Sequence, residues 1–154
     1  MQNTQFKDIQ FSLGNDEAGK QIEAALLTSL SNDLPQSTNV SFVLTAKNLA
    51  GELIGGLTAS TSYGWFLVKV VWVKDDFRGC GIGRALMDKA EEKARNSECH
   101  SLWLDTSNPE AKRFYDSLGF TVFGELHNKP DQYPPEHSRW FMKKELESFS
   151  HSAI

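Results

Sequence analysis

A glycine-rich turn between a strand and a helix is the feature that most restricts how this chain can fold. Residues 70–83 read VVWVKDDFRGCGIG, so an apolar run is followed by three closely spaced glycines. The residues after the turn repeat apolar side chains at helical spacing, which predicts a helix that begins at the end of the turn. The segment therefore predicts the order strand, loop, helix.

Such a turn is chemically suited to bind a phosphate group. Glycine lets the backbone approach a ligand closely, and the first N–H groups of a helix lack intrahelical acceptors and attract anions. Arg78 and Arg84 add positive charge beside the turn. A turn that only connects the two elements is the alternative. The sequence contains neither the Gly-Lys-Ser/Thr ending nor the Gly-x-Gly-x-x-Gly spacing of the better-known nucleotide loops at this position.

The rest of the chain alternates strand and helix patterns and predicts an α/β (α+β) fold. Because a helix separates the apolar strand 65–73 from the strand 101–106, we expect these two strands to be parallel and to splay at their carboxyl ends. The other strands predict a mixed, mainly antiparallel sheet flanked by helices. The predicted strands are 9–13, 40–46, 53–60, 65–73, 101–106, 120–123 and 138–146, and the predicted helices begin near residues 15, 82 and 109.

The helix that begins near residue 109 has clear start and stop signals. Asn108 is a candidate N-cap, Pro109 occupies the first helical position and Gly119 follows the last turn. Tyr115 lies on the apolar face of this helix beside Phe114, so a core aromatic residue is one interpretation of it. For Asn108 a helix cap and a ligand contact are compatible.

Two motifs of the chain resemble the GNAT superfamily of acyl-CoA-dependent N-acyltransferases. The spacing Arg78-x-x-Gly81-x-Gly83 is similar to the pyrophosphate-binding signature of that family. The segment 108–120, which reads NPEAKRFYDSLGF, resembles the family's segment after its fifth strand. The resemblance is specific over residues 65–123. It implies a single N-acetyltransferase domain over residues 1–154, with 148–154 as a tail.

The resemblance also implies roles for individual residues. Backbone groups of Val71 and Val73 would pair with the pantetheine arm of acetyl-CoA and orient the acetyl carbonyl. The Tyr115 hydroxyl would lie near the thioester sulfur and act as the catalytic acid for the departing thiolate. Cys80 lies between two glycines and is interpreted as a spacer rather than a nucleophile. The implied cofactor-binding set is Val71, Trp72, Val73, Arg78, Gly79, Cys80, Gly81, Ile82, Gly83, Arg84, Asn108 and Tyr115.

The sequence alone does not identify the base that deprotonates the acceptor amine. The central strand 65–73 carries only one charge, Lys69, and no carboxylate. His137 and Tyr133, on the long loop before the last strand, are expected at the mouth of the site. A water chain is an alternative to a side chain. The candidate bases are Glu52, Asp105, His127, Asp131, Glu136 and His137.

The resemblance predicts an enzyme that transfers an acetyl group from acetyl-CoA to a primary amine of a small molecule or a protein, by direct attack in a ternary complex. A non-catalytic CoA-binding sensor or regulatory module is the alternative. A nucleotide-binding protein of another class is disfavoured because the turn lacks a lysine. The resemblance makes a homodimer plausible.

Charge and cysteine content narrow the partners and the compartment. The net charge of −4 argues against a nucleic-acid binder, and no apolar run predicts a membrane span. Two cysteines are too few for a disulfide framework or a usual zinc site, so we expect no metal, reduced thiols and a cytoplasmic location.

Overall fold

The computed structural model describes residues 6–31, 35 and 39–147. The chain divides into two compact units, residues 1–36 and 37–154, and each is described by itself. The elements in chain order are the 3₁₀ helix η1 (Phe6–Asp8), α1 (Asp16–Ser31), β1 (Ser41–Lys47), β2 (Leu53–Ser62), β3 (Trp65–Val73), the 3₁₀ helix η2 (Asp75–Phe77), α2 (Ile82–Asn96), β4 (Ser101–Thr106), α3 (Pro109–Ser117), β5 (Thr121–His127) and β6 (Ser138–Glu145).

The first unit contains one long helix, α1. Asn15 caps it, since its Oδ1 accepts a hydrogen bond from the Ala18 N–H at 2.9 Å, and the predicted start of this helix is confirmed. The predicted strand 9–13 is wrong. The residues before it form the turn η1, and the rings of Phe6 and Phe11 lie 5.5 Å apart. An alternating pattern of five residues specifies no hydrogen-bonding partner, and the six-stranded sheet of the described residues does not include this segment.

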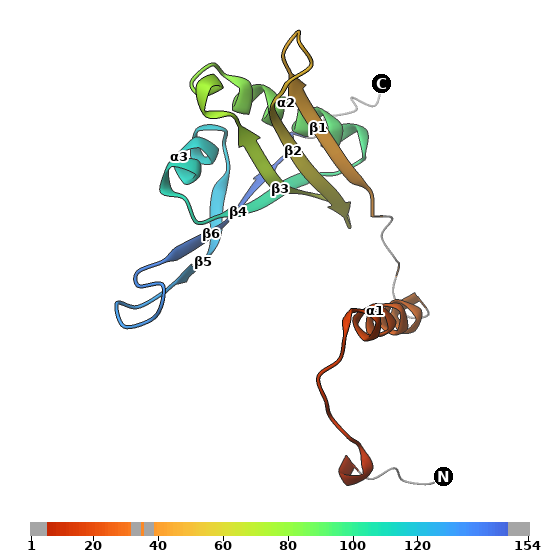
Figure 1. The fold of residues 1–154 in the computed structure, drawn as a ribbon. Coiled ribbons are helices and arrows are strands. Elements are labelled where there is room, and N and C mark those ends of the chain that lie inside the picture. The colour runs from red at the N-terminus through yellow and green to blue at the C-terminus, as the bar shows by residue number, and fades with distance from the viewer. Residues whose placement is uncertain (1–5, 32–34, 36–38, 148–154) are drawn as a thin grey trace. The chain divides into compact units, whose positions relative to one another are not determined.

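The second unit is a six-stranded sheet with helices α2 and α3 (Figure 1). The strand order is β1-β2-β3-β4-β6-β5, and every neighbouring pair is antiparallel except β3 and β4. The predicted mixed, mainly antiparallel sheet with a central parallel pair is therefore confirmed. Its core is continuous: Phe66 on β3, Leu102 on β4 and Ala90 on α2 are all 0% exposed and belong to one cluster that also includes Tyr115 on α3.

A bulge in β3 and an early end to its pairing with β4 open the sheet. Thr58 pairs with Val70 and Ala59 with Val68, so Lys69 has no partner on β2 and forms a β-bulge. The side-chain alternation shifts at this point, so that Val71 and Val73 pack against the core. On its other edge β3 pairs with β4 only from Trp65 to Leu67. The predicted splay of the two parallel strands is thus present beyond Leu67.

The β2 glycines allow the backbones of β1, β2 and β3 to pack closely. A Cβ added at Gly56 would lie 2.9 Å from the Leu44 carbonyl oxygen, whereas one added at Gly124 on β5 would have its nearest neighbour at 3.7 Å. We therefore expect Gly56→Ala to lower the free energy of unfolding by about 1–3 kcal/mol, because backbone must shift to admit the methyl group. Gly124→Ala is the matched control and should change stability by less than about 1 kcal/mol. Urea unfolding midpoints measure both, and equal midpoints for the two variants would contradict this account of Gly56.

Candidate functional site

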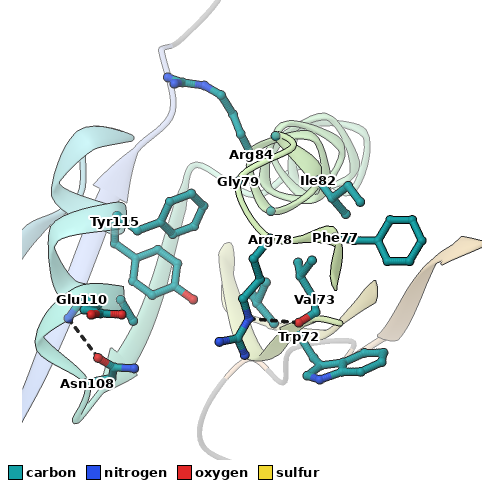
Figure 2. Close-up of a pocket in the computed structure, with 15 residues that line it drawn as sticks. Trp72, Val73, Phe77, Arg78, Gly79, Ile82, Arg84, Asn108, Glu110 and Tyr115 are labelled. Carbon is teal, nitrogen blue, oxygen red and sulfur yellow. Dashed lines mark hydrogen bonds between the residues drawn. The ribbon is translucent and has the colours of Figure 1, made fainter. Parts of the chain in front are cut away.

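A cavity of about 450 Å³ lies in the second unit, where the end of β3, the glycine turn and helix α3 converge (Figure 2). It contains eleven of the twelve residues that the sequence predicted to bind the cofactor, all except Cys80. Sequence reasoning missed four further lining residues, Phe77, Glu110, Ala111 and Phe114, although the last three fall inside the second motif. The full lining is Val71, Trp72, Val73, Phe77, Arg78, Gly79, Gly81, Ile82, Gly83, Arg84, Asn108, Glu110, Ala111, Phe114 and Tyr115.

The glycine turn presents unpaired backbone donors to this cavity. Gly81 is the N-cap of α2 in the left-handed conformation (φ 83°), and no side chain caps the helix. The first intrahelical bond of the helix runs from Ala85 N–H to the Gly81 carbonyl at 3.0 Å, so the N–H groups before Ala85 have no intrahelical acceptor. A Cβ added at Gly79 or Gly81 meets no atom within 4 Å. This open, glycine-lined helix N-terminus fits a diphosphate.

The two arginines beside the turn have different environments. The Arg78 guanidinium is held by the Asp75 carboxylate at 3.1 Å and donates from Nε to the Val73 carbonyl at 3.3 Å. Figure 2 shows this side chain next to the end of β3 and Arg84 pointing away from it. Within the described part of the chain, Arg84 makes no ion pair or side-chain hydrogen bond. The Arg78 guanidinium is therefore held in place at the end of β3, whereas the Arg84 guanidinium is available to a ligand.

Cys80 lies in the turn but does not line the cavity. Its thiol is exposed and lies 3.9 Å from the Arg78 carbonyl oxygen. Its backbone position between Gly79 and Gly81 fits the interpretation of Cys80 as a spacer.

The splayed edge of β3 forms one wall of the cavity. Val71 and Val73 line it, and their peptide groups have no strand partner on the β4 side. Such an edge can pair with an extended, amide-containing chain in the way that a strand pairs with its neighbour. The bulge at Lys69 keeps Val71 and Val73 on the core side of the sheet, and the sequence contains no signal for it, because both faces of this strand are apolar apart from Lys69.

Helix α3 supplies the opposite wall. The Asn108 Oδ1 accepts a hydrogen bond from the Glu110 N–H at 2.9 Å, so Asn108 both caps the helix and lines the cavity. The predicted Pro109 position is confirmed, and Gly119, which follows the C-cap residue Leu118, has φ 93°.

Tyr115 combines a packed ring with a hydroxyl that faces the cavity (Figure 2). The residue is 8% exposed, and its ring lies 5.2 Å from Phe114 and 5.8 Å from Phe120. Among the described residues, no protein group is hydrogen-bonded to this hydroxyl. Burial raises its pKa above the ordinary value of 10.0, so the hydroxyl keeps its proton at neutral pH. Tyr115 is both a core aromatic residue and a cavity residue.

The candidate bases do not line the cavity, and most have other partners. Glu52 is paired with Lys74, whose hydrogen bond holds the pKa of Glu52 below its ordinary value. Asp105 is paired with Arg139 at 2.9 Å, and His127 Nδ1 lies 2.7 Å from Ser138 Oγ. His137 differs from these, because its Nε2 lies 3.2 Å from Ser107 Oγ, next to the cavity residue Asn108. Asp131, Glu136 and Tyr133 are exposed on the loop.

A second hollow, of about 440 Å³, is lined by Trp65, Trp103, Phe123 and Lys143. Trp103 alternates with the core residues Leu102 and Leu104, so this hollow lies on the other face of the sheet from the core. It contains none of the motif residues. In the described ranges, no three His, Cys, Asp or Glu side chains gather to form a metal site, and no helix is both long and apolar enough to cross a membrane.

These features are suited to an elongated, phosphorylated ligand that lies between two splayed parallel strands with its phosphates at a helix N-terminus. Residues 11–120 match the Acetyltransferase (GNAT) family. An acetyltransferase of Agrobacterium fabrum is 36% identical over 110 residues, which cover 71% of this chain and 80% of that protein. The blasticidin-S acetyltransferase of Streptomyces morookaense is 29% identical over 133 residues, which cover 86% of this chain and 93% of that protein.

A solved structure agrees with this similarity. A crystal structure from Agrobacterium tumefaciens, assigned as an acetyltransferase, superposes with a TM-score of 0.77 and 30% identity, covering 90% of this chain and 98% of that one. The chain belongs to the GNAT acetyltransferase family. It is an acyl-CoA-dependent N-acetyltransferase, as the two motifs predicted.

Proposed function

We propose that this enzyme transfers the acetyl group of acetyl-CoA to the primary amine of a small molecule, by direct attack in a ternary complex. The observation that carries the proposal is the cavity itself, which has a free helix N-terminus at one end and the Tyr115 hydroxyl facing the unpaired edge of β3. In this arrangement the diphosphate binds at residues 79–84 and the pantetheine arm pairs with Val71 and Val73, near Asn108.

Groups of this protein are suited to stabilise the negative charge that develops on the carbonyl oxygen and on the departing sulfur during acetyl transfer. A neutral amine attacks the thioester carbonyl, and a β3 N–H aimed at the carbonyl oxygen stabilises the negative charge that forms there. As the C–N bond forms and the C–S bond breaks, Tyr115 donates its proton to the sulfur. The tyrosinate recovers a proton from the new amide nitrogen, and a second proton from the ammonium substrate leaves to solvent. The products are an acetamide, CoA thiol and one proton.

A small-molecule acceptor is favoured over a protein by the similarity to blasticidin-S acetyltransferase, which spans most of both chains. Two free thiols, Cys80 and Cys99, support a cytoplasmic location. The family match crosses both compact units, which supports one N-acetyltransferase domain over residues 1–154. A homodimer stays a prediction.

Thiol release from acetyl-CoA tests this proposal. With a panel of blasticidin S, a polyamine, an amino sugar and a peptide with a free amino terminus, we expect turnover with at least one of the small molecules and none with the peptide. Intact mass measured after incubation with acetyl-CoA alone should show no added acetyl group, because direct attack forms no acetyl-enzyme. Acetylated protein in that control would contradict direct attack, and turnover of the peptide alone would contradict a small-molecule acceptor.

A further inference from the structure

The attacking amine is protonated at neutral pH, so a group near the cavity must take up a proton before the C–N bond can form. A histidine is the side chain best suited to exchange protons near pH 7. Two of the chain's histidines lie on the β5–β6 hairpin, His127 at the end of β5 and His137 just before β6. These two histidines differ in their hydrogen-bonding partners. His127 pairs with Ser138 within the hairpin, whereas His137 reaches the connection between β4 and α3.

We propose that Ser107 and His137 form a proton relay that accepts the proton of the acceptor amine. This inference rests on the proposed function. Ser107 Oγ lies 3.2 Å from His137 Nε2, although the residues are 30 positions apart in sequence. Ser107 directly precedes Asn108, which lines the cavity. The hydrogen bond therefore connects the segment that follows β4, next to a cavity residue, to a histidine on the hairpin.

The local backbone holds Ser107 in place. The Asn108 N–H donates to Thr106 Oγ1 at 3.2 Å, and the Asn108 side chain caps α3, so the connection between β4 and α3 is fixed on both sides of Ser107. The hairpin end is fixed by a bond from the Asn128 N–H to the His137 carbonyl at 2.8 Å. The two groups thus belong to separate ordered segments that meet at this hydrogen bond.

The proton transfer balances in the His137 tautomer that carries its hydrogen on Nδ1. Ser107 O–H donates to His137 Nε2 and moves its proton there, while the Ser107 oxygen takes a proton from the amine nitrogen. The neutral amine then attacks the thioester carbonyl. His137 is exposed and passes its proton to water, which completes the cycle without any further reactant. The charged groups on the neighbouring segments are His127 on β5, the Asp105–Arg139 pair on β4 and β6, and Lys129, Asp131 and Glu136 on the loop.

Glu110 is the competing candidate, because its carboxylate lines the cavity beside Asn108. It lies in the first turn of α3, where a negative charge interacts favourably with the helix N-terminus. A carboxylate at this position can attract a cationic substrate without taking its proton. The experiment must therefore separate His137 from Glu110.

The test compares His137→Gln with the matched control His127→Gln on the same hairpin. For a strongly basic primary amine found in the acceptor panel, we expect His137→Gln to lower kcat/KM about 30-fold, less than the typical range for general base catalysis because water has access to this exposed position. The KM for acetyl-CoA should not change. For a weakly basic analogue such as a hydrazide, which is already neutral at pH 7, the loss should be under about threefold. His127→Gln should lose less than about twofold with either acceptor.

Two further variants complete the design. Ser107→Ala and the double variant Ser107→Ala/His137→Gln should each resemble His137→Gln, because groups that act as one unit are not additive. Equal losses for the two acceptors, a loss of acetyl-CoA affinity, or a Glu110→Gln variant with the same acceptor-dependent pattern would each overturn the relay. Wild-type enzyme that binds CoA but turns over no amine would instead overturn the proposed function, and the relay with it.

Discussion

Gly81→Asp is expected to abolish binding of CoA and acetyl-CoA. Gly81 is the N-cap of α2, and the space where its side chain would stand is open in the protein and lies where we propose that the diphosphate binds. A carboxylate placed there puts a like charge against the diphosphate. Two like charges about 4 Å apart repel by about 4 kcal/mol at an effective dielectric near 20, which corresponds to a loss of about 1,000-fold in affinity.

Gly51→Asp is a close control for this change. Gly51 has φ 81° against 83° for Gly81, and an added Cβ at Gly51 also meets no atom within 4 Å, but Gly51 lies in the turn between β1 and β2 and outside the cavity. Both variants therefore carry the same backbone cost and the same charge. Isothermal titration with CoA should show binding to Gly51→Asp and none to Gly81→Asp. A dissociation constant for Gly81→Asp within tenfold of the wild-type value would contradict the placement of the diphosphate at this turn.

The parts of the fold that could be predicted are those that a short stretch of sequence determines by itself. The apolar run of β3, the cap at Asn108, the proline at position 109 and the glycine turn each specify their own backbone, and the structure places them as expected. The parallel arrangement of β3 and β4 followed from the helix between them. The prediction of a strand at residues 9–13 was wrong. A short alternating pattern shows which residues could share a face of a strand, but not whether a partner strand is present.

The cavity was predictable as a set of motif residues but not as a shape. The bulge at Lys69 depends on the register between β2 and β3, which no single strand encodes, and it keeps Val71 and Val73 on the core side of the sheet, where they line the cavity. The contact between Ser107 and His137 depends on the length and path of the hairpin. Long-range pairings of this kind require the structure, whereas the glycine turn and the α3 cap are present in short stretches of sequence.

Tyr115→Phe is expected to lower kcat by about 100- to 1,000-fold, in the lower part of the range of about 100- to 10,000-fold that positioned acids and bases typically contribute. The thiolate leaving group needs a proton, and the Tyr115 hydroxyl is the tyrosine hydroxyl that faces the cavity in the described part of the chain. Burial raises the pKa of this hydroxyl above its ordinary value of 10.0, so deprotonation of Tyr115 should not lower wild-type activity below that pH.

The fold should tolerate this substitution, which makes the result interpretable. The ring packs against Phe114 and Phe120, and phenylalanine keeps both contacts. The hydroxyl makes no hydrogen bond with the described residues, so its removal should leave the thermal midpoint and the affinity for CoA close to the wild-type values. Steady-state kinetics with saturating acetyl-CoA, combined with CoA titration of the same sample, separate the chemical step from binding. Because a structural role would weaken binding or stability together with the rate, a variant that keeps full kcat would remove Tyr115 from the chemistry, and one that loses CoA affinity as much as rate would make it a packing residue.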